Sequence, residues 1–309
     1  MADAPARPQP ATPDAPRPVL VATDFSAHAR HAADRAARIA REKATSLALL
    51  HVMPGEPLLQ LRQWLGAASA PEADMRAEAT RRLARVAGDL QATRQVETRS
   101  RVAAGEPIDE ILREADVLDA RLIVLGARGT GFLRRLVLGT TAERLLRRTT
   151  RPLLVVRQLP QRGYRRLLVA VDFSPWSAHA LGLARRTAPH AHLMLFTACQ
   201  VPFEDQLVYA GVDRATIESY REKARAEATR KLHALAWAAG LKPGQWEPCV
   251  VDGDASLRIV EKEQELDCDL VVLGKHGVAA SVDLLLGSVT QHVLAEGSSD
   301  VLVSTARDA

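Results

Sequence analysis

The sequence predicts an α/β protein made of two tandem copies of one domain, each with a parallel sheet covered by helices, and three observations lead to this fold class. Short runs rich in leucine or β-branched residues alternate with helical stretches along the chain. The whole pattern occurs twice in the chain, and matched motifs of the two copies are separated by 148 positions. Glycine follows the apolar runs LIVL and LVVL in the two halves. Strands that alternate with helices favour right-handed crossovers and a parallel sheet covered by helices on both faces.

The internal repeat fixes the expected domain organisation. VLVATDFS at Val19 returns as LLVAVDFS at Leu167, and LIVLGARG at Leu122 returns as LVVLGKHG at Leu270. RAEATR returns with an offset of 149, which indicates that a helix is kept while its flanking loops absorb one residue. We therefore predict a disordered Pro/Ala-rich tail over residues 1–17, a first domain over 18–158 and a second over 165–306. QLPQRGYR lies between the domains and reads as a short polar linker.

Each predicted element follows from local pattern. Continuously apolar runs predict strands that are buried on both faces. In the first half these are Val19 to Ala22, Leu47 to Val52, Gln95 to Val102, Leu122 to Leu125 and Leu153 to Val156. Helices are expected at Ala27 to Lys43, Ala73 to Gln91, Ile108 to Leu118 and Thr140 to Arg148. The second half predicts strands near 166–171, 192–197, 246–252, 270–273 and 301–304.

Composition narrows the class of protein. The chain has 309 residues, of which 47% are hydrophobic and 25% charged, and its net charge is +4. Arginines scattered along helices, without interleaved aromatics, argue against a nucleic-acid binder. Three distant cysteines with no CxxC spacing favour a reducing compartment over a disulfide or zinc framework. No segment reaches membrane-spanning length, so we expect a cytoplasmic protein without membrane contact.

The glycines after the fourth strand of each half predict an anion site. Ligands of open α/β sheets bind outside the carboxyl ends of the strands. Gly126 and Gly129 would let the backbone turn and approach a ligand closely. Gly139 and Thr140 would then open a helix whose first N–H groups attract negative charge. Ordinary packing and helix capping are the alternative explanations, but the repetition of the whole spacing at Gly274, Gly277, Gly287 and Ser288 favours a phosphate site.

Several catalytic patterns are absent from the sequence. It contains no GxxxxGK[ST], no GxSxG and no HExxH, and no GxGxxG follows the first strand. His28 and His31 could share a helix face, but no third metal ligand is apparent. His276 could reach a phosphate, and Cys268 reads as a small buried residue. We therefore expect no dedicated catalyst, and any hydrolysis should be slow and incidental.

The motif GxxG-x9-G[ST], together with DxS at the end of the first strand, resembles the universal stress proteins in a tandem two-domain form. The resemblance covers nearly the whole chain. It implies two tandem Rossmann-like (adenine nucleotide alpha hydrolase-like) domains, each a five-stranded parallel sheet of order 3-2-1-4-5 with helices on both faces. It also implies ATP, with or without Mg²⁺, as the ligand. The domains are expected to pair through their last strands as an intramolecular pseudo-dimer.

The resemblance assigns site residues in each copy. The phosphate-binding residues would be Gly126, Gly129, Gly139 and Thr140 in the first copy and Gly274, Gly277, Gly287 and Ser288 in the second, with the neighbours Arg128, Thr141, Lys275 and Val289. Asp24 and Asp172 match the aspartate at the ribose and adenine end. Val52 and, less closely, Ala198 match the position whose backbone contacts adenine. An N-cap for the helix that starts near Ser26 is the alternative role of Asp24.

The two copies differ in charge. Arg128, Arg134 and Arg135 lie in the first glycine segment, whereas the second carries Lys275 and Asp283. Arginine adds charge-assisted hydrogen bonds to phosphate, so we predict tighter nucleotide binding in the first copy. The alternative is that Arg134 and Arg135 face solvent.

Three functions stay open on the sequence. The first is an ATP-binding stress or regulatory module, in which the segments Pro54 to Glu72 and Val201 to Ile217 respond to nucleotide or to a protein partner. Trp64 and Tyr209 are the aromatics expected to be exposed there. The second is a scaffold without nucleotide, and the third is a weak ATPase or autophosphorylating enzyme. Whether two chains form a homodimer, and which protein partner the chain has, cannot be read from the sequence.

Overall fold

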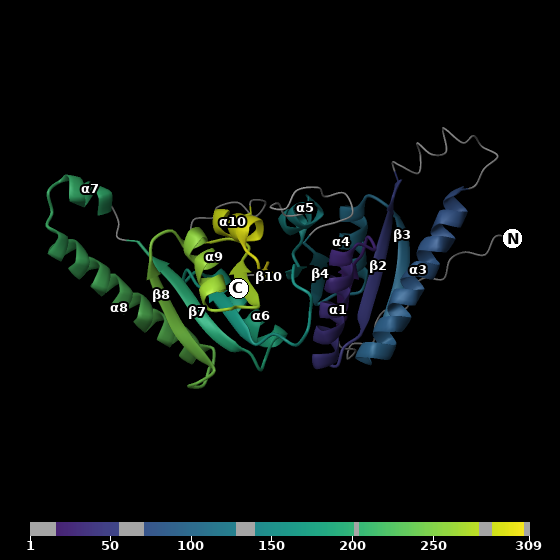
Figure 1. Cartoon of the computed structure of the whole chain (residues 1–309), viewed down its shortest axis with the longest axis horizontal. Helices are drawn as coiled ribbons and strands as arrows, with labels where there is room; N and C mark the ends of the chain where they lie inside the picture. The colour runs from purple at the N-terminus through teal and green to yellow at the C-terminus, as the bar shows by residue number, and fades with distance from the viewer. Residues whose placement is uncertain (1–16, 56–70, 128–139, 201–203, 278–285, 306–309) are drawn as a thin grey trace.

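The two halves of the chain form one continuous ten-stranded sheet in this computed structural model (Figure 1), which describes residues 17–55, 71–127, 140–200, 204–277 and 286–305. The strand order is β3-β2-β1-β4-β5-β10-β9-β6-β7-β8. Each half therefore has the expected order 3-2-1-4-5, with parallel pairing inside it. The predicted fold class is confirmed for both halves.

The observed elements follow the predicted ones closely. In the first half the strands are β1 (Val19–Ala22), β2 (Leu47–Pro54), β3 (Thr98–Gly105), β4 (Leu122–Gly126) and β5 (Leu153–Val156). Its helices are α1 (Ala27–Glu42), α3 (Pro71–Arg94), α4 (Pro107–Val117) and α5 (Thr140–Arg148). The second half has β6 (Arg166–Ala170), β7 (His192–Cys199), β8 (Trp246–Asp252), β9 (Leu270–Gly274) and β10 (Asp300–Ser304). Its helices are α6 (Pro175–Thr187), α7 (Glu204–Tyr209), α8 (Arg214–Ala238), α9 (Ala255–Glu265) and α10 (Ser288–Glu296).

Strand β3 is displaced from its predicted position. We expected a strand from Gln95, but β3 begins at Thr98, where it pairs with Leu47 of β2. Gln95 has φ 55°, a left-handed conformation that cannot continue an extended strand. Register with β2, rather than the local run of residues, therefore sets the start of β3.

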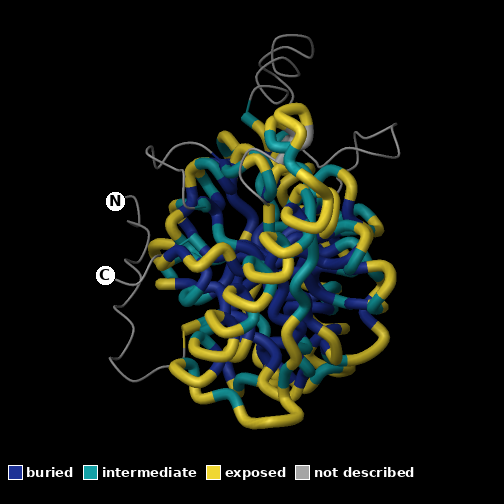
Figure 2. Tube along the Cα trace, turned by 90° about the vertical axis from the view of Figure 1, so that its left-hand side faces the viewer, coloured by how far each residue is buried: buried dark blue, intermediate teal, exposed yellow. Residues whose placement is uncertain are grey.

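Alternating strand residues build one core on each face of the sheet. Val19 and Val21 of β1 pack on the face covered by α1, α3, α6 and α8, whereas Leu20 packs on the face covered by α4, α5, α9 and α10. Both cores run across the two halves. Figure 2 shows the buried residues inside a mostly exposed outer layer. Burial on both faces explains the continuously apolar strands read from the sequence.

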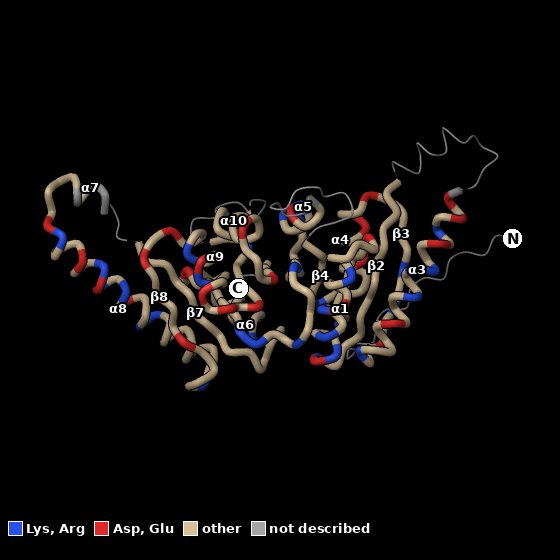
Figure 3. Tube along the Cα trace, viewed as in Figure 1, with Lys and Arg blue, Asp and Glu red and all other residues tan. Residues whose placement is uncertain are grey.

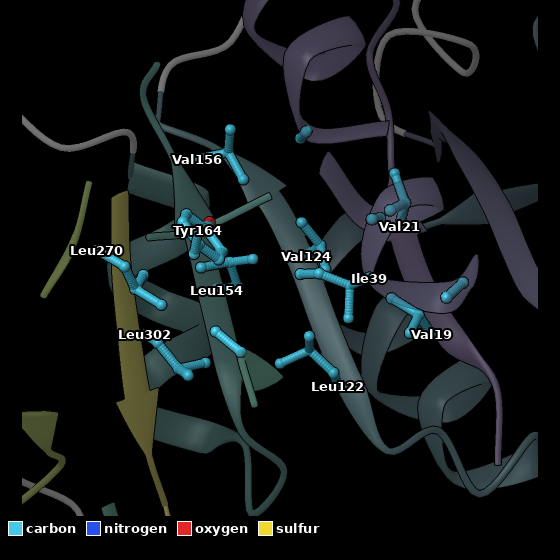
Figure 4. Packing of buried hydrophobic residues seen from close by; sticks show 14 of the residues in the cluster. Val19, Val21, Ile39, Leu122, Val124, Leu154, Val156, Tyr164, Leu270 and Leu302 are labelled. Atoms are coloured by element: carbon cyan, nitrogen blue, oxygen red, sulfur yellow. The ribbon is translucent and has the colours of Figure 1, made fainter. Parts of the chain in front are cut away.

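The two halves meet at an antiparallel seam. Leu154 of β5 lies opposite Leu302 of β10, and Val155 lies opposite Val301. Figure 4 shows Tyr164 of the linker packed beside Leu154, with Leu302 close by in the second half. The linker was expected to be polar and exposed, but Tyr164 is buried there.

Asp300 is the polar centre of this seam and is fully buried. Its Oδ1 accepts the backbone N–H groups of Arg157 (2.7 Å) and Gln158 (3.0 Å), and its Oδ2 accepts the Tyr164 hydroxyl at 2.7 Å. The Nε of Arg35, on α1, lies 3.3 Å from Oδ2. Burial, and secondly the charge of Asp300, raise the pKa of Tyr164 well above its ordinary value, which keeps the hydroxyl a donor.

Candidate functional site

The turn after the first strand has the same unusual backbone in both copies. Phe25 and Phe173 have φ 64° and 61°, a left-handed conformation that bulky residues rarely adopt. The aspartate just before each phenylalanine holds the turn, because Asp24 Oδ1 accepts Ser26 N–H and Asp172 Oδ1 accepts Ser174 N–H, both at 3.0 Å. Such strain costs about 1–3 kcal/mol and concentrates at functional sites.

The role of Asp24 as an N-cap is wrong. Ser26 is the N-cap of α1, and its Oγ accepts the Ala29 N–H at 3.1 Å. Asp24 instead closes the turn one step earlier, at the carboxyl end of β1. In the second copy Asp172 Oδ1 also accepts the hydroxyl groups of Ser174 and Ser177.

A cavity of about 520 Å³ lies at the carboxyl ends of β6 and β9 in the second copy. Its volume is within the range of small-molecule sites, about 300–1,000 Å³. Six of the predicted residues line it: Asp172, Gly274, Gly277, Gly287, Ser288 and Val289. Sequence reasoning missed the apolar wall, which includes Phe196, Ile259, Leu273 and Leu286, and the hydroxyl groups of Ser177 and Thr290. The apolar pattern of β7 and β9 could have indicated Phe196 and Leu273, and that of α9 could have indicated Ile259.

At two glycines of the second motif, a side chain would come into close contact with neighbouring atoms. A Cβ on Gly277 would lie 3.0 Å from Asp172 Oδ2, so the two halves of the predicted motif meet at this point. A Cβ on Gly287 would lie 3.3 Å from the carbonyl oxygen of Lys275. Gly287 is the N-cap of α10 and has no side-chain oxygen to cap the first N–H groups of that helix. The positive end of α10 therefore faces the cavity at Ser288 and Val289.

The first glycine of each motif packs against a helix. A Cβ on Gly126 would lie 2.7 Å from the carbonyl carbon of His28 and 3.0 Å from the nitrogen of Ala29, both in the first turn of α1. A Cβ on Gly274 would lie 3.0 Å from the Cβ of Trp176 on α6. Close contact between helix and strand thus requires these two glycines, whether or not a ligand is bound.

Lys275 does not line the cavity. Its side chain is buried, and its ammonium group donates to the carbonyl oxygens of Arg147 (3.1 Å) and Thr149 (3.4 Å) at the end of α5 in the first copy. The expectation that Lys275 faces phosphate thus differs from the structure, because the carboxyl end of a helix attracts the cation. Ala198 does not line the cavity either, and it packs against the core on that face of the sheet.

Part of the first copy lies outside the described residues. Arg128, Gly129 and Gly139 belong to residues 128–139, as do Arg134 and Arg135, and Trp64 belongs to residues 56–70. Val52 packs against the same core as Ala198, and Thr141 lies in the first turn of α5, which begins at Thr140. Tyr209, at the end of α7, is 96% exposed.

Neither a metal site nor a membrane span is evident in the described ranges. Those residues form no group of three His, Cys, Asp or Glu side chains that could hold a metal ion, and the rings of His28 and His31 are 6.3 Å apart. Within the same ranges, every helix is too short or too polar to cross a bilayer.

Comparison of the sequence with models of known protein families shows which family the chain belongs to. A family model described as the universal stress protein family matches residues 16–157 and again residues 163–305. The chain belongs to the universal stress protein family. Its two copies of the family domain correspond to the two halves of the sheet.

Individual universal stress proteins agree with this. Universal stress protein Rv2005c of Mycobacterium tuberculosis is 25% identical over 217 residues, which cover 69% of this chain and 70% of that protein. Universal stress protein YxiE of Bacillus subtilis is 31% identical over 145 residues, which are 45% of this chain and 97% of that protein. A solved universal stress protein from Archaeoglobus fulgidus has a TM-score of 0.67 at 17% identity and covers 93% of this chain and 97% of its own, which shows a shared fold.

Proposed function

We propose that this universal stress protein binds an adenine nucleotide, with ATP as the reference ligand, at the carboxyl edge of each half of the sheet. Occupancy would change its conformation or its choice of protein partner in a stress response. The observation that carries the proposal is the cavity of the second copy, where Asp172, Gly277 and the start of α10 meet.

The residues of this cavity suit the parts of a nucleotide. Ser288 and Val289, at the positive end of α10, would hold the phosphates through their N–H groups. Asp172, which lines the cavity at the carboxyl end of β6, would accept ribose hydroxyls through its carboxylate. The apolar wall, with Phe196 and Ile259, would take the base.

Titration calorimetry with Gly277→Val tests the proposal. The new side chain would meet Asp172 Oδ2 and fill the space between the two motifs. We expect ATP affinity at the second site to fall at least tenfold, while the first site keeps its affinity. Gly88→Val is the matched control, because no atom lies within 4 Å of the position of its Cβ on α3. Equal ATP affinity in Gly277→Val and the wild type would overturn the proposal.

The other open functions have simple readouts. A scaffold without nucleotide predicts that the purified chain carries no adenine absorbance at 260 nm and takes up no ATP. A matching Gly129→Val variant tests whether the first copy binds more tightly, as its arginines predict; equal losses in the two variants would contradict that asymmetry.

A further inference from the structure

A second cavity lies at the junction of the two copies, on the edge of the sheet opposite to the candidate nucleotide site. Its volume is about 600 Å³. Residues from α1, from the linker and from the amino ends of β6, β7 and β9 line it. The cavity thus combines both copies and the linker, and the linker occurs once in the chain.

Basic side chains dominate the lining. Four arginines, Arg35, Arg162, Arg165 and Arg166, line it together with His192, against the two carboxylates of Asp267 and Asp269. Figure 3 shows Lys and Arg positions along the lower edge of the molecule between α6 and α1, where the linker runs. Arg35 pairs with Asp300, and His192 Nε2 lies 3.3 Å from Glu247 Oε1. The excess of positive charge therefore rests on the three linker-side arginines.

The buried side chain of Arg35 forms one side of this cavity. Its side chain is 4% exposed, its Nη1 donates to the carbonyl oxygen of Arg162 at 2.8 Å, and its guanidinium carbon lies 4.0 Å from the centre of the Tyr164 ring. Together with the ion pair to Asp300, these contacts hold the linker against α1. The backbone of Arg162 is therefore held by a buried network, and its exposed side chain extends from that fixed position.

Neither carboxylate of the lining forms an ion pair with the outer arginines, Arg162 and Arg165. Asp269 accepts the backbone N–H groups of Arg165 (2.8 Å) and Arg166 (3.2 Å), so its oxygens already hold the linker. Arg166 donates to the carbonyl oxygen of Leu266 at 3.0 Å. In the described part of the chain, neither Arg162 nor Arg165 forms an ion pair through its guanidinium group. Two exposed cations thus face one polar cavity without a direct ion pair, and Asp267 and Asp269 are the carboxylates that share the lining.

We propose that the junction cavity binds a small anion that carries several phosphate groups, with Arg162 and Arg165 as its main ligands. Planar guanidinium groups bind phosphate oxygens in pairs, and a multivalent anion matches several of them at once. Inorganic polyphosphate and the phosphate chain of a free nucleotide share this chemistry. The proposal does not rest on nucleotide binding at the carboxyl edge, and the single linker limits the junction site to one per chain.

Calorimetric titration of the full-length chain with tripolyphosphate at low salt tests the junction site. In addition to any binding at the carboxyl-edge phosphate sites, we expect one saturable site per chain that is kept in Gly277→Val. Its affinity should be roughly tenfold weaker in Arg162→Gln/Arg165→Gln, because two charge-assisted contacts are lost. ATP affinity at the carboxyl edge should not change in that variant. Arg81→Gln/Arg99→Gln removes the same charge from exposed positions elsewhere and should keep its tripolyphosphate affinity within twofold.

Three results would overturn the junction site. They are no saturable binding of tripolyphosphate, an equal loss in the Arg81/Arg99 control, or a loss confined to Gly277→Val. The last result would place the anion in the nucleotide site instead. Competition by ATP in the Gly277→Val background identifies the source of the anion: displacement of tripolyphosphate indicates nucleotide phosphates, and its retention indicates inorganic polyphosphate. Both of these results support an anion site at the junction.

Discussion

The two copies of the domain share their site backbone but not their contacts across the seam. The Asp-Phe-Ser turn is strained in the same way in both copies, at Phe25 and Phe173. In contrast, the residue after the first motif glycine is Ala127 in one copy and Lys275 in the other, although both donate their backbone N–H to the last residue of the neighbouring strand. Features set by backbone geometry are thus repeated, whereas side chains at the seam have diverged.

The seam is capped reciprocally by unlike cations. Lys275 of the second copy donates to the last carbonyls of α5, and Arg157 of the first copy donates to the carbonyl oxygens of Leu294 and Gly297 at the end of α10. A cation near the carboxyl end of a helix stabilises it. Each copy therefore provides the cation that caps the carboxyl end of a helix in the other copy. The two cations stand at different positions of the repeat, so the repeated sequence alone does not predict these contacts.

The largest effect should come from breaking the centre of the seam with Asp300→Ala. Removal of this carboxylate leaves Arg35 buried beside it without its counter-charge, so we expect a loss of about 3–5 kcal/mol in the free energy of unfolding. Urea denaturation measures it. Pro152→Ala, at the position of the first copy that matches Asp300, is the control and should cost less than about 1 kcal/mol. Similar losses in the two variants would show that the seam is not centred on Asp300.

A smaller effect is expected from Lys275→Met, which keeps the length of the side chain but removes its charge. The carbonyl oxygens of Arg147 and Thr149 would lose their donor, at a cost of about 1–2 kcal/mol in unfolding free energy. ATP affinity of the second site should change less than twofold, because Lys275 does not line the cavity. A tenfold loss of ATP affinity at unchanged stability would instead support Lys275 as a phosphate ligand, the role predicted from the sequence.

The smallest effect is expected from Tyr164→Phe, at about 1 kcal/mol near neutral pH. Its pKa is raised in the folded state, so the hydroxyl contributes its stability below the unfolded pKa of about 10 and loses it as the pH rises above that value. Wild-type stability should therefore fall more steeply than that of Tyr164→Phe between about pH 9 and 11. Tyr220→Phe, exposed on α8, is the control. Parallel pH profiles for Tyr164→Phe and the wild type would contradict this account of the linker.

The sequence predicts those features of the molecule that depend on local pattern. The offset of 148 positions and the apolar runs predict the repeated strands and helices, whereas the strand order of each half follows from the family resemblance. The motif also places Asp172 and Gly277 at the same site, where they meet in the structure. The direction of Lys275 could not be predicted, because its acceptors belong to the other copy. The burial of Tyr164 likewise depends on Asp300, which is 136 positions away in the chain. Contacts between repeats are set by the packed seam rather than by the period of the sequence.

Native mass spectrometry of the full-length chain with excess ATP tests the central claim most directly, since it counts bound nucleotides on each molecule. With the junction site removed by Arg162→Gln/Arg165→Gln, the account predicts two bound adenine nucleotides, and one when Gly277→Val is added. A chain of that background that retains no nucleotide, or one with Gly277→Val that still retains two, would contradict the account.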